Sequence, residues 1–242
     1  FLILKKIGWK SGQILLQLES KKYFIKMKRK NIIIIGAGNT ADEIYPILQN
    51  LKKNKQFNIQ AILDDDKRYY KKKIHDIPIY IGIENAKKYK NAFFVFGIGS
   101  FKNKNKRKKI LDKTSLDVER FPNIIDTSAK IENNVNLGYG NIVYPHSVIC
   151  SGTKIKNFCI FTYHNILAHN VVVNSFSIFG SRTSILNNTK IGKEVFVGAN
   201  VLVGENILVD DYSTIVMGSV VFTNIKKRQI VFGNPAKVIK NG

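Results

Sequence analysis

Two histidines five residues apart stand in the stretch YHNILAHN, residues 163–170. The chain has four histidines in all, so His164 and His169 are conspicuous candidates for chemistry. Imidazole titrates near neutral pH, which suits a general base, and its neutral ring nitrogen is also a common zinc ligand. The spacing alone leaves two hypotheses open, a catalytic base and a metal site.

The elements that must position these histidines follow a period of six. Seventeen apolar residues succeed one another at steps of six without a break, from Ile125 to Val221. The residue directly after each of these apolar residues is often glycine or acidic, and the residue four positions after each is usually small or β-branched. This period is typical of a parallel β-helix, in which inward residues stack on counterparts eighteen positions away. We predict such a β-helix over residues 121–242.

Residues 27–120 show a different pattern, of strand, glycine turn and helix. NIIIIGAGNT gives a buried apolar run followed by Gly36 and Gly38, and an amphipathic helical pattern comes next. Further strands are expected in FNIQAILDDD, which ends with Asp64 and Asp65, and in NAFFVFGIGS. Parallel strands end at one edge of a sheet, where open α/β proteins bind ligands. A segment of this length forms only one mononucleotide-binding half, which favours a nucleotide-linked small molecule over NAD.

Composition narrows the class of protein further. The chain has 242 residues, of which 44% are hydrophobic, so a packed core is expected. Two cysteines are too few for a disulfide framework, and we expect a cytoplasmic protein. No stretch approaches the roughly 18 apolar residues of a membrane span. Met27 resembles a natural start, so residues 1–26 are interpreted as a non-native or fused upstream segment.

The formal net charge of +22 invites comparison with nucleic-acid-binding proteins. The excess is concentrated in residues 1–120, in lysine runs such as KKNK and FKNKNKRKKILDK that are typical of solvated helix faces and loops. We therefore expect no specific nucleic-acid partner. Peripheral contact with an anionic membrane surface is compatible with such basic patches.

The hexapeptide repeat resembles the left-handed β-helix of hexapeptide acyltransferases, many of which end in a Gly-Asn-Pro-Ala segment similar to VFGNPAKVIK, residues 231–240. Combined with IIIIGAG, ILDDD and FPNIIDTSAKI, the pattern resembles the sugar acetyltransferases of the bacillosamine and sialic-acid pathways over residues 27–240. The resemblance implies a fold class of α/β plus all-β, with a small Rossmann-like parallel βαβ domain before a left-handed parallel β-helix. It also implies a homotrimer, acetyl-CoA as co-substrate and no metal cofactor. The implied reaction transfers acetyl to an amine or hydroxyl of a nucleotide-linked sugar in surface-glycan synthesis.

The same resemblance assigns roles on the β-helix. His169 is the expected general base, which takes a proton from the sugar amine or hydroxyl. Asn170 stands at the family's acidic partner position, so another acid must approach His169 or the base is weaker. Ile178 stands where the family often has a second histidine near the acetyl group. Asn187, with Asn188, replaces a glycine pair near the CoA groove, a mild change because Asn tolerates positive φ.

Roles in the N-terminal domain are implied in the same way. Gly36 and Gly38 are expected to face the diphosphate of the nucleotide. Asp64 and Asp65 are expected to hydrogen-bond its base or ribose. For both pairs a purely local role, in a tight βα turn or a solvated acidic turn, is an open alternative. The sequence does not distinguish the sugar, the nucleotide, an amine from a hydroxyl acceptor, or acetyl from a longer acyl group.

Two other functions stay open at this point. The γ-class carbonic anhydrases are similar in their β-helix and bind zinc through three histidines, two of them five apart, which suggests His146, His164 and His169 as ligands. Arg182 lies eighteen residues after His164, and a cation there opposes a dication. The second alternative is a catalytically degenerate scaffold, because Asn170 and Ile178 depart from the family pattern.

Overall fold

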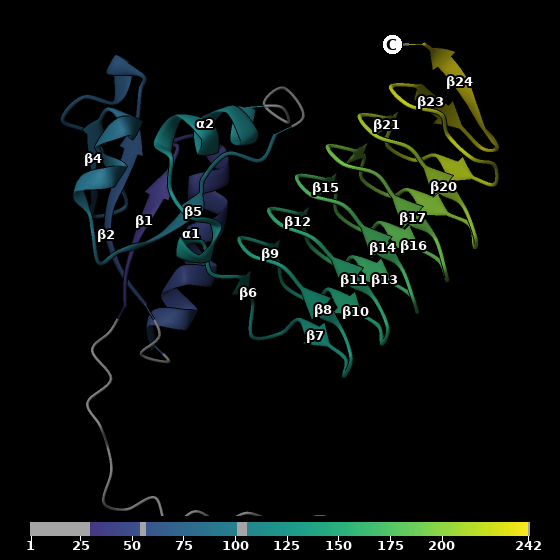
Figure 1. Ribbon diagram of the computed structural model, residues 1–242, viewed down its shortest axis with the longest axis horizontal. Coiled ribbons are helices and arrows are strands. Elements are labelled where there is room, and N and C mark those ends of the chain that lie inside the picture. Colours follow the sequence, from purple (N-terminus) through teal and green to yellow (C-terminus); the bar gives the residue numbers. More distant parts are fainter. Residues whose placement is uncertain (1–29, 54–56, 101–105, 242) are drawn as a thin grey trace, which may run out of the picture.

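The computed structural model describes residues 30–53, 57–100 and 106–241. A small open sheet with helices is followed by a long β-helix (Figure 1). This arrangement confirms the predicted fold class, a Rossmann-like domain before a β-helix. The interpretation of residues 1–26 falls outside the described residues.

The N-terminal domain is a five-stranded sheet with the strand order β3-β4-β2-β1-β5. All neighbouring strands are parallel except β3 and β4, which form an antiparallel hairpin beyond the three predicted strands. Its elements are β1 (Lys30–Ile35), α1 (Asn39–Lys53), β2 (Phe57–Asp64), β3 (Lys73–Ile74), β4 (Ile77–Ile81), β5 (Phe93–Phe96) and α2 (Lys106–Thr114), with short 3₁₀ helices at Lys67–Tyr69, Ile83–Lys88 and Val118–Arg120. None of the helices in the described ranges is long and apolar enough to cross a bilayer.

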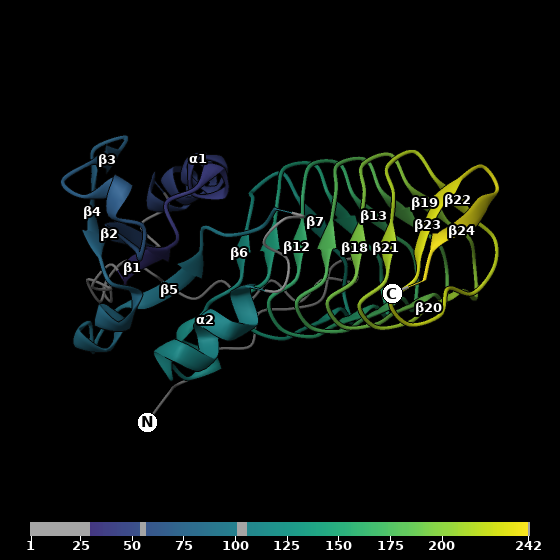
Figure 2. The ribbon, with the colours of Figure 1, turned by 90° about the horizontal axis from the view of Figure 1, so that it is seen from above.

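Alternation along β1 explains its unbroken isoleucine run. Ile32 and Ile34 pack into the core that contains α1, whereas Ile33 and Ile35 pack into the core on the opposite face. Figure 2 shows α1 and α2 on the two sides of the sheet. A strand covered on both faces needs apolar residues at every position, because none of its side chains reaches water.

The β-helix begins after this domain and consists of two-residue strands. They are β6 (Ile124–Ile125), β7 (Lys130–Ile131), β8 (Asn136–Leu137), β9 (Ile142–Val143), β10 (Val148–Ile149), β11 (Lys154–Ile155), β12 (Ile160–Phe161), β13 (Ile166–Leu167), β14 (Val172–Val173), β15 (Ile178–Phe179), β16 (Ser184–Ile185), β17 (Lys190–Ile191), β18 (Phe196–Val197), β19 (Leu202–Val203), β20 (Leu208–Val209), β21 (Thr214–Ile215) and β22 (Val220–Val221). Each of the predicted apolar residues is the second residue of one strand. An antiparallel hairpin of β23 (Ile230–Gly233) and β24 (Ala236–Lys240) follows.

Three sheets form the faces of the β-helix. We call them the domain-facing sheet (β6, β9, β12, β15, β18 and β21, extended by β23 and β24), the second sheet (β7, β10, β13, β16, β19 and β22) and the third sheet (β8, β11, β14, β17 and β20). From β6 to β19, each strand pairs in parallel with the strand eighteen residues later, as Ile149 does with Leu167. A residue with positive φ recurs every six positions from Asn134 to Gly218, once at each corner. This corner conformation closes each coil after three strands.

The two domains share a core. The outward residues Ile142, Ile160 and Ile178 of the domain-facing sheet are buried together with α1 residues. Arg107 of α2 is also fully buried and donates hydrogen bonds to the carbonyl oxygens of Phe158 (2.5 Å) and Phe176 (2.6 Å). Burial lowers the pKa of Arg107 to about 10, so it stays charged at neutral pH. These contacts fix the domain against one face of the β-helix.

The inward column of the β-helix provides a test of the packing. Phe179 stacks on Phe161 one coil earlier, with ring centroids 4.7 Å apart. We predict that Phe179→Ala lowers the free energy of unfolding by about 3–5 kcal/mol, because the surrounding coils cannot collapse into the cavity. Chemical denaturation measures this loss, and Phe222→Ala is the control because Phe222 is 61% exposed. Equal losses in the two variants would contradict the assigned orientation of Phe179.

Candidate active site

His169 lies at the edge between the second and third sheets. It follows β13 and precedes β14, and its side chain is exposed. Its backbone amide donates to Oδ1 of Asn187 in the next coil (3.0 Å). The neighbouring Asn170 takes the corner conformation with φ of 59° and donates to Asn188 at 3.3 Å. Contacts with Asn187 and Asn188 in the next coil therefore hold the segment from which the imidazole projects.

Two further reactive side chains meet His169 at this edge. The amide of Glu132 donates to Ile149 (2.9 Å) and that of Cys150 donates to Leu167 (2.8 Å), so the ladder places these residues in successive coils below His169. One carboxylate oxygen of Glu132, the sulfur of Cys150 and one ring nitrogen of His169 all lie within 4.8 Å of one another. We call these three residues the edge cluster.

Glu132 brings a carboxylate to the histidine. Its Oε2 accepts a hydrogen bond from the Ser151 amide (3.0 Å), and its Oε1 lies 3.6 Å from Nζ of Lys130. The Ser151 hydrogen bond and the charge of Lys130 hold the pKa of Glu132 below its usual value, so the group is ionised at neutral pH. A carboxylate from two coils earlier therefore lies near the imidazole of His169.

Cys150 completes the edge cluster as a free thiol of intermediate exposure. Burial and the charge of Glu132 raise the pKa of the Cys150 thiol above its ordinary value. The thiol is therefore protonated at neutral pH and is a weaker nucleophile than a typical catalytic cysteine.

The structure brings one of the two predicted cofactor residues to His169. Asn187 accepts a hydrogen bond from the His169 amide and donates one to Glu205 at 2.8 Å, so it lies in the coil directly after His169. Asn188 has a φ of 60°, as expected for an asparagine that replaces glycine. The prediction that Ile178 contacts the cofactor must be corrected, because Ile178 lies on the domain-facing sheet, is 2% exposed and packs in the core between the domains. Its side chain does not reach the His169 edge.

The three histidines of the zinc hypothesis do not meet within one chain, and a site shared between subunits stays a prediction. His146 and His164 stack on each other, with ring centroids 5.1 Å apart, at the edge between the domain-facing and second sheets. His169 lies at a different edge of the coil. Within the described residues the edge cluster is the one group of three potential ligands, and it contains a single histidine. The chain by itself does not assemble His146, His164 and His169 into one site.

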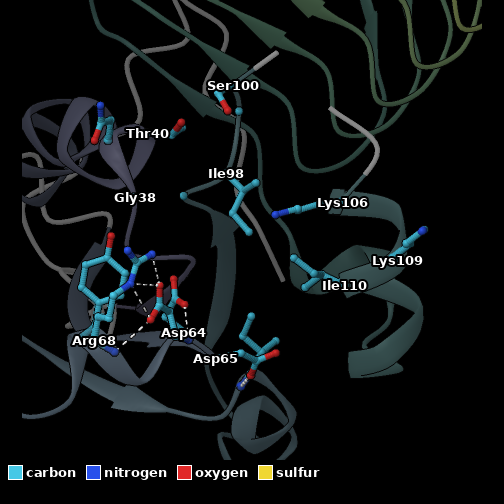
Figure 3. A pocket seen from close by; sticks show the side chains of 16 residues that line it. Gly38, Thr40, Asp64, Asp65, Arg68, Ile98, Ser100, Lys106, Lys109 and Ile110 are labelled. Atoms are coloured by element: carbon cyan, nitrogen blue, oxygen red, sulfur yellow. Dashed lines mark hydrogen bonds and ion pairs between the residues drawn. The ribbon is translucent and has the colours of Figure 1, made fainter. Parts of the chain in front are cut away.

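A pocket of about 730 Å³ opens in the N-terminal domain, at the carboxyl ends of the strands (Figure 3). In the sheet, β1 is flanked by β2 on one side and by β5 on the other, so the strand order reverses at β1. The pocket lies at this point of reversal, which is the usual ligand position in open α/β sheets. The lining residues are Gly38, Asn39, Thr40, Asp64, Asp65, Asp66, Arg68, Tyr69, Ile83, Gly97, Ile98, Gly99, Ser100, Lys106, Lys109 and Ile110.

The predicted glycines have different positions around this pocket. Gly38 lines it, and a Cβ atom at Gly38 would meet nothing within 4 Å, so a ligand has room to approach the backbone. Gly36 is buried with φ of 102° and donates to Leu63 at 2.8 Å, and a Cβ atom there would overlap Ile98. Gly36 therefore serves the tight turn and, contrary to expectation, is not in the pocket lining.

Both predicted aspartates line the pocket and are engaged in local contacts. Asp64 accepts from the amides of Ala37 (2.6 Å) and Asp66 (2.8 Å). Asp65 accepts from the Ile83 amide (2.8 Å) and forms an ion pair with Lys113 (2.8 Å). Binding of a nucleotide by these carboxylates stays a prediction, because both already organise the loops at the strand ends.

The pocket also contains cations that the sequence pattern did not single out. Lys106 extends from α2 toward Ile98 in Figure 3, and Lys109 lies one turn further along the same helix. Arg68 borders the opposite side, where it is paired with Asp66 at 2.6 Å. Together with the amides at the start of α1, these groups suit an anionic ligand.

Comparison with known proteins agrees with this domain structure. Residues 31–114 match the family model described as the PglD N-terminal domain. The matched residues include all those that line the pocket. A comparison with curated proteins gives no match.

Solved structures extend the similarity to most of the chain. A mutant of perosamine N-acetyltransferase from Caulobacter crescentus, in complex with CoA and GDP-perosamine, is 18% identical with a TM-score of 0.77, over 87% of this chain and 97% of that one. The acetyltransferase domain of PglB from Neisseria gonorrhoeae, in complex with acetyl coenzyme A, is 20% identical with a TM-score of 0.76, over 87% and 100%. WeeI from Acinetobacter baumannii is 18% identical with a TM-score of 0.66, over 87% and 100%. The predicted resemblance is confirmed for the PglD-type domain and for the fold of the whole.

Proposed function

We propose that the protein is an acetyl-CoA-dependent acetyltransferase that acetylates an amine or hydroxyl of a nucleotide-linked sugar in surface-glycan synthesis. The observation that carries this proposal is the exposed imidazole of His169 beside the ionised carboxylate of Glu132. It is supported by the fold, which the chain shares with one structure that holds CoA and GDP-perosamine and another that holds acetyl coenzyme A.

The reaction needs one proton to move twice. The neutral imidazole of His169 accepts the proton of the acceptor amine or hydroxyl while the nitrogen or oxygen attacks the thioester carbonyl carbon. The tetrahedral intermediate then collapses, the carbon–sulfur bond breaks, and the imidazolium returns its proton to the leaving CoA thiolate. No acyl-enzyme forms, so much of the rate comes from holding two substrates in line.

Glu132 supports this cycle through its charge. The imidazole becomes positively charged in the transition state, and a carboxylate a few ångströms away stabilises that charge. Because the Ser151 amide holds one carboxylate oxygen, the side chain is oriented before the reaction begins. The role that the family gives to the residue after the histidine passes here to Glu132.

The pocket of the N-terminal domain is proposed to hold the nucleotide. The start of α1 and Lys106 would face the diphosphate, with Gly38 allowing close approach. Asp64 and Asp65 are proposed to contact the base or ribose at the rim. A cytoplasmic location, where acetyl-CoA is made, and peripheral contact of the lysine-rich N-terminal half with an anionic membrane both stay predictions.

The position of the two sites favours an oligomer. His169 lies on the edge between the second and third sheets, which is opposite the domain-facing sheet in a three-sided coil. The proposed nucleotide pocket belongs to the domain that packs against the domain-facing sheet (Figure 1). A sugar bound in one chain is therefore better placed for the histidine of a neighbouring chain. We propose a homotrimer, with each active site between two subunits.

An apolar stripe on the second sheet fits this assembly. Its outward residues include Val148, Ile166, Leu202 and Val220, whereas lysines Lys154 and Lys190 alternate with apolar residues along the third sheet. Ile166 is 45% exposed and lies three residues before His169, so this apolar surface is next to the proposed site. Burying such residues against a second copy removes apolar surface from water.

Substitution of this stripe tests the trimer. We predict that Ile166→Glu shifts the protein to monomers in light scattering and lowers acetyl transfer, because a buried unpaired carboxylate destabilises the interface. Leu208→Glu is the matched control, since Leu208 is 46% exposed on the third sheet. A trimer that survives Ile166→Glu, or a wild-type protein that is monomeric, contradicts the proposed interface.

Acetyl transfer itself is tested with UDP- and GDP-linked amino sugars and acetyl-CoA, with CoA formation followed by chromatography. We predict that His169→Ala lowers kcat/KM by about 10²–10⁴-fold, the usual contribution of a general base. Glu132→Gln should lower it by about tenfold, equivalent to ~1.4 kcal/mol of lost charge stabilisation.

The control for this assay is His164→Ala, which removes an exposed histidine at another edge and should leave the rate unchanged. An undiminished rate in His169→Ala would exclude His169 as the base. Tight binding of a sugar nucleotide without transfer by the wild-type protein would instead mean a non-catalytic binding protein.

A further inference from the structure

The edge cluster has a composition that general acid–base chemistry does not require. Acetyl transfer needs the imidazole and benefits from the carboxylate, but the thiol of Cys150 has no part in it. A carboxylate oxygen, a thiol sulfur and an imidazole nitrogen within 4.8 Å of one another form a mixed set of metal-binding atoms. Such a set prefers zinc or cobalt over magnesium or calcium, which favour oxygen ligands alone.

We propose that Glu132, Cys150 and His169 form a site for a zinc ion that inhibits the protein by occupying the catalytic imidazole. The inhibition rests on the proposed function, whereas metal binding does not. The ion is not a cofactor in this account, since it competes with the proton for the same nitrogen of His169.

The geometry permits coordination with small adjustments. Zinc ligands at about 2.0–2.3 Å from the ion in a tetrahedron stand roughly 3.3–3.8 Å apart, so side-chain rotations suffice to close separations of up to 4.8 Å. The three residues come from successive coils whose backbone hydrogen bonds are already formed. Metal binding therefore costs little conformational entropy of the backbone. Since His169 is exposed, solvent can occupy the fourth position.

The nearest charged group opposes the ion and has room to move. Lys130 lies 3.6 Å from Oε1 of Glu132, and its side chain is 70% exposed, so it can swing into solvent. The other oxygen of Glu132 is held by the Ser151 amide. A hollow of about 430 Å³ lined by Lys130, Ile131, Glu132, Asn133 and Ser151 leaves space beside the carboxylate.

Binding is tested on the full chain without substrates, by calorimetry with Zn²⁺ and by absorption with Co²⁺ as a spectroscopic probe. The wild-type protein should bind one ion per chain and show a thiolate-to-cobalt charge-transfer band. Cys150→Ser should remove the band and weaken Zn²⁺ binding by about tenfold or more. His164→Ala should leave both unchanged, because the stacked pair of His146 and His164 lies at another edge.

Inhibition is tested on the same variants with acetyl-CoA and the amino-sugar acceptors. Cys150→Ser should keep metal-free acetyl transfer and lose its sensitivity to Zn²⁺, whereas a chelator should restore the wild-type rate. Absence of a cobalt thiolate band, unchanged Zn²⁺ affinity in Cys150→Ser, or loss of binding in His164→Ala each overturns the proposed site. A protein that binds Zn²⁺ through Cys150 but transfers no acetyl group would leave the site standing and refute the proposed function.

Discussion

The register of the β-helix is the constraint on which the rest of the structure depends. Each strand from β6 to β19 is hydrogen-bonded to the strand eighteen residues later, and a positive-φ residue turns the chain at every sixth position from Asn134 to Gly218. A shift by one residue would turn the inward apolar column to solvent, so packing and hydrogen bonding select the same register. Because this register is strict, residues far apart in sequence acquire fixed neighbours along each edge.

The candidate active site is a direct consequence of this register. Glu132 and Cys150 are one coil apart, and His169 lies one residue beyond the next coil position. No loop has to fold over to assemble them, and the ladder bonds limit their motion before any substrate arrives. The pocket of the N-terminal domain lies away from this edge, because that domain packs against the domain-facing sheet. This separation is the physical reason to expect a second subunit in each site.

The sequence predicts the β-helix better than the site it carries. Seventeen apolar residues at steps of six locate every strand from β6 to β22, since this period has few alternative explanations. The same arithmetic could have revealed Glu132, which lies two coils before the neighbour of His169, and could have excluded Ile178, which lies half a coil away. The pocket cations were beyond reach, because a lysine-rich helix pattern does not tell which lysines the tertiary fold turns toward a ligand.

We propose that one β-helix register joins His169 and Glu132 into a single site of acetyl transfer. A crystal structure of the protein with CoA would test this arrangement. We expect the sulfur end of CoA next to the imidazole of His169, with the Glu132 carboxylate near the same ring and a neighbouring subunit closing the groove. CoA bound away from this edge, or a coil register that separates Glu132 from His169, would show that the proposed site is wrong.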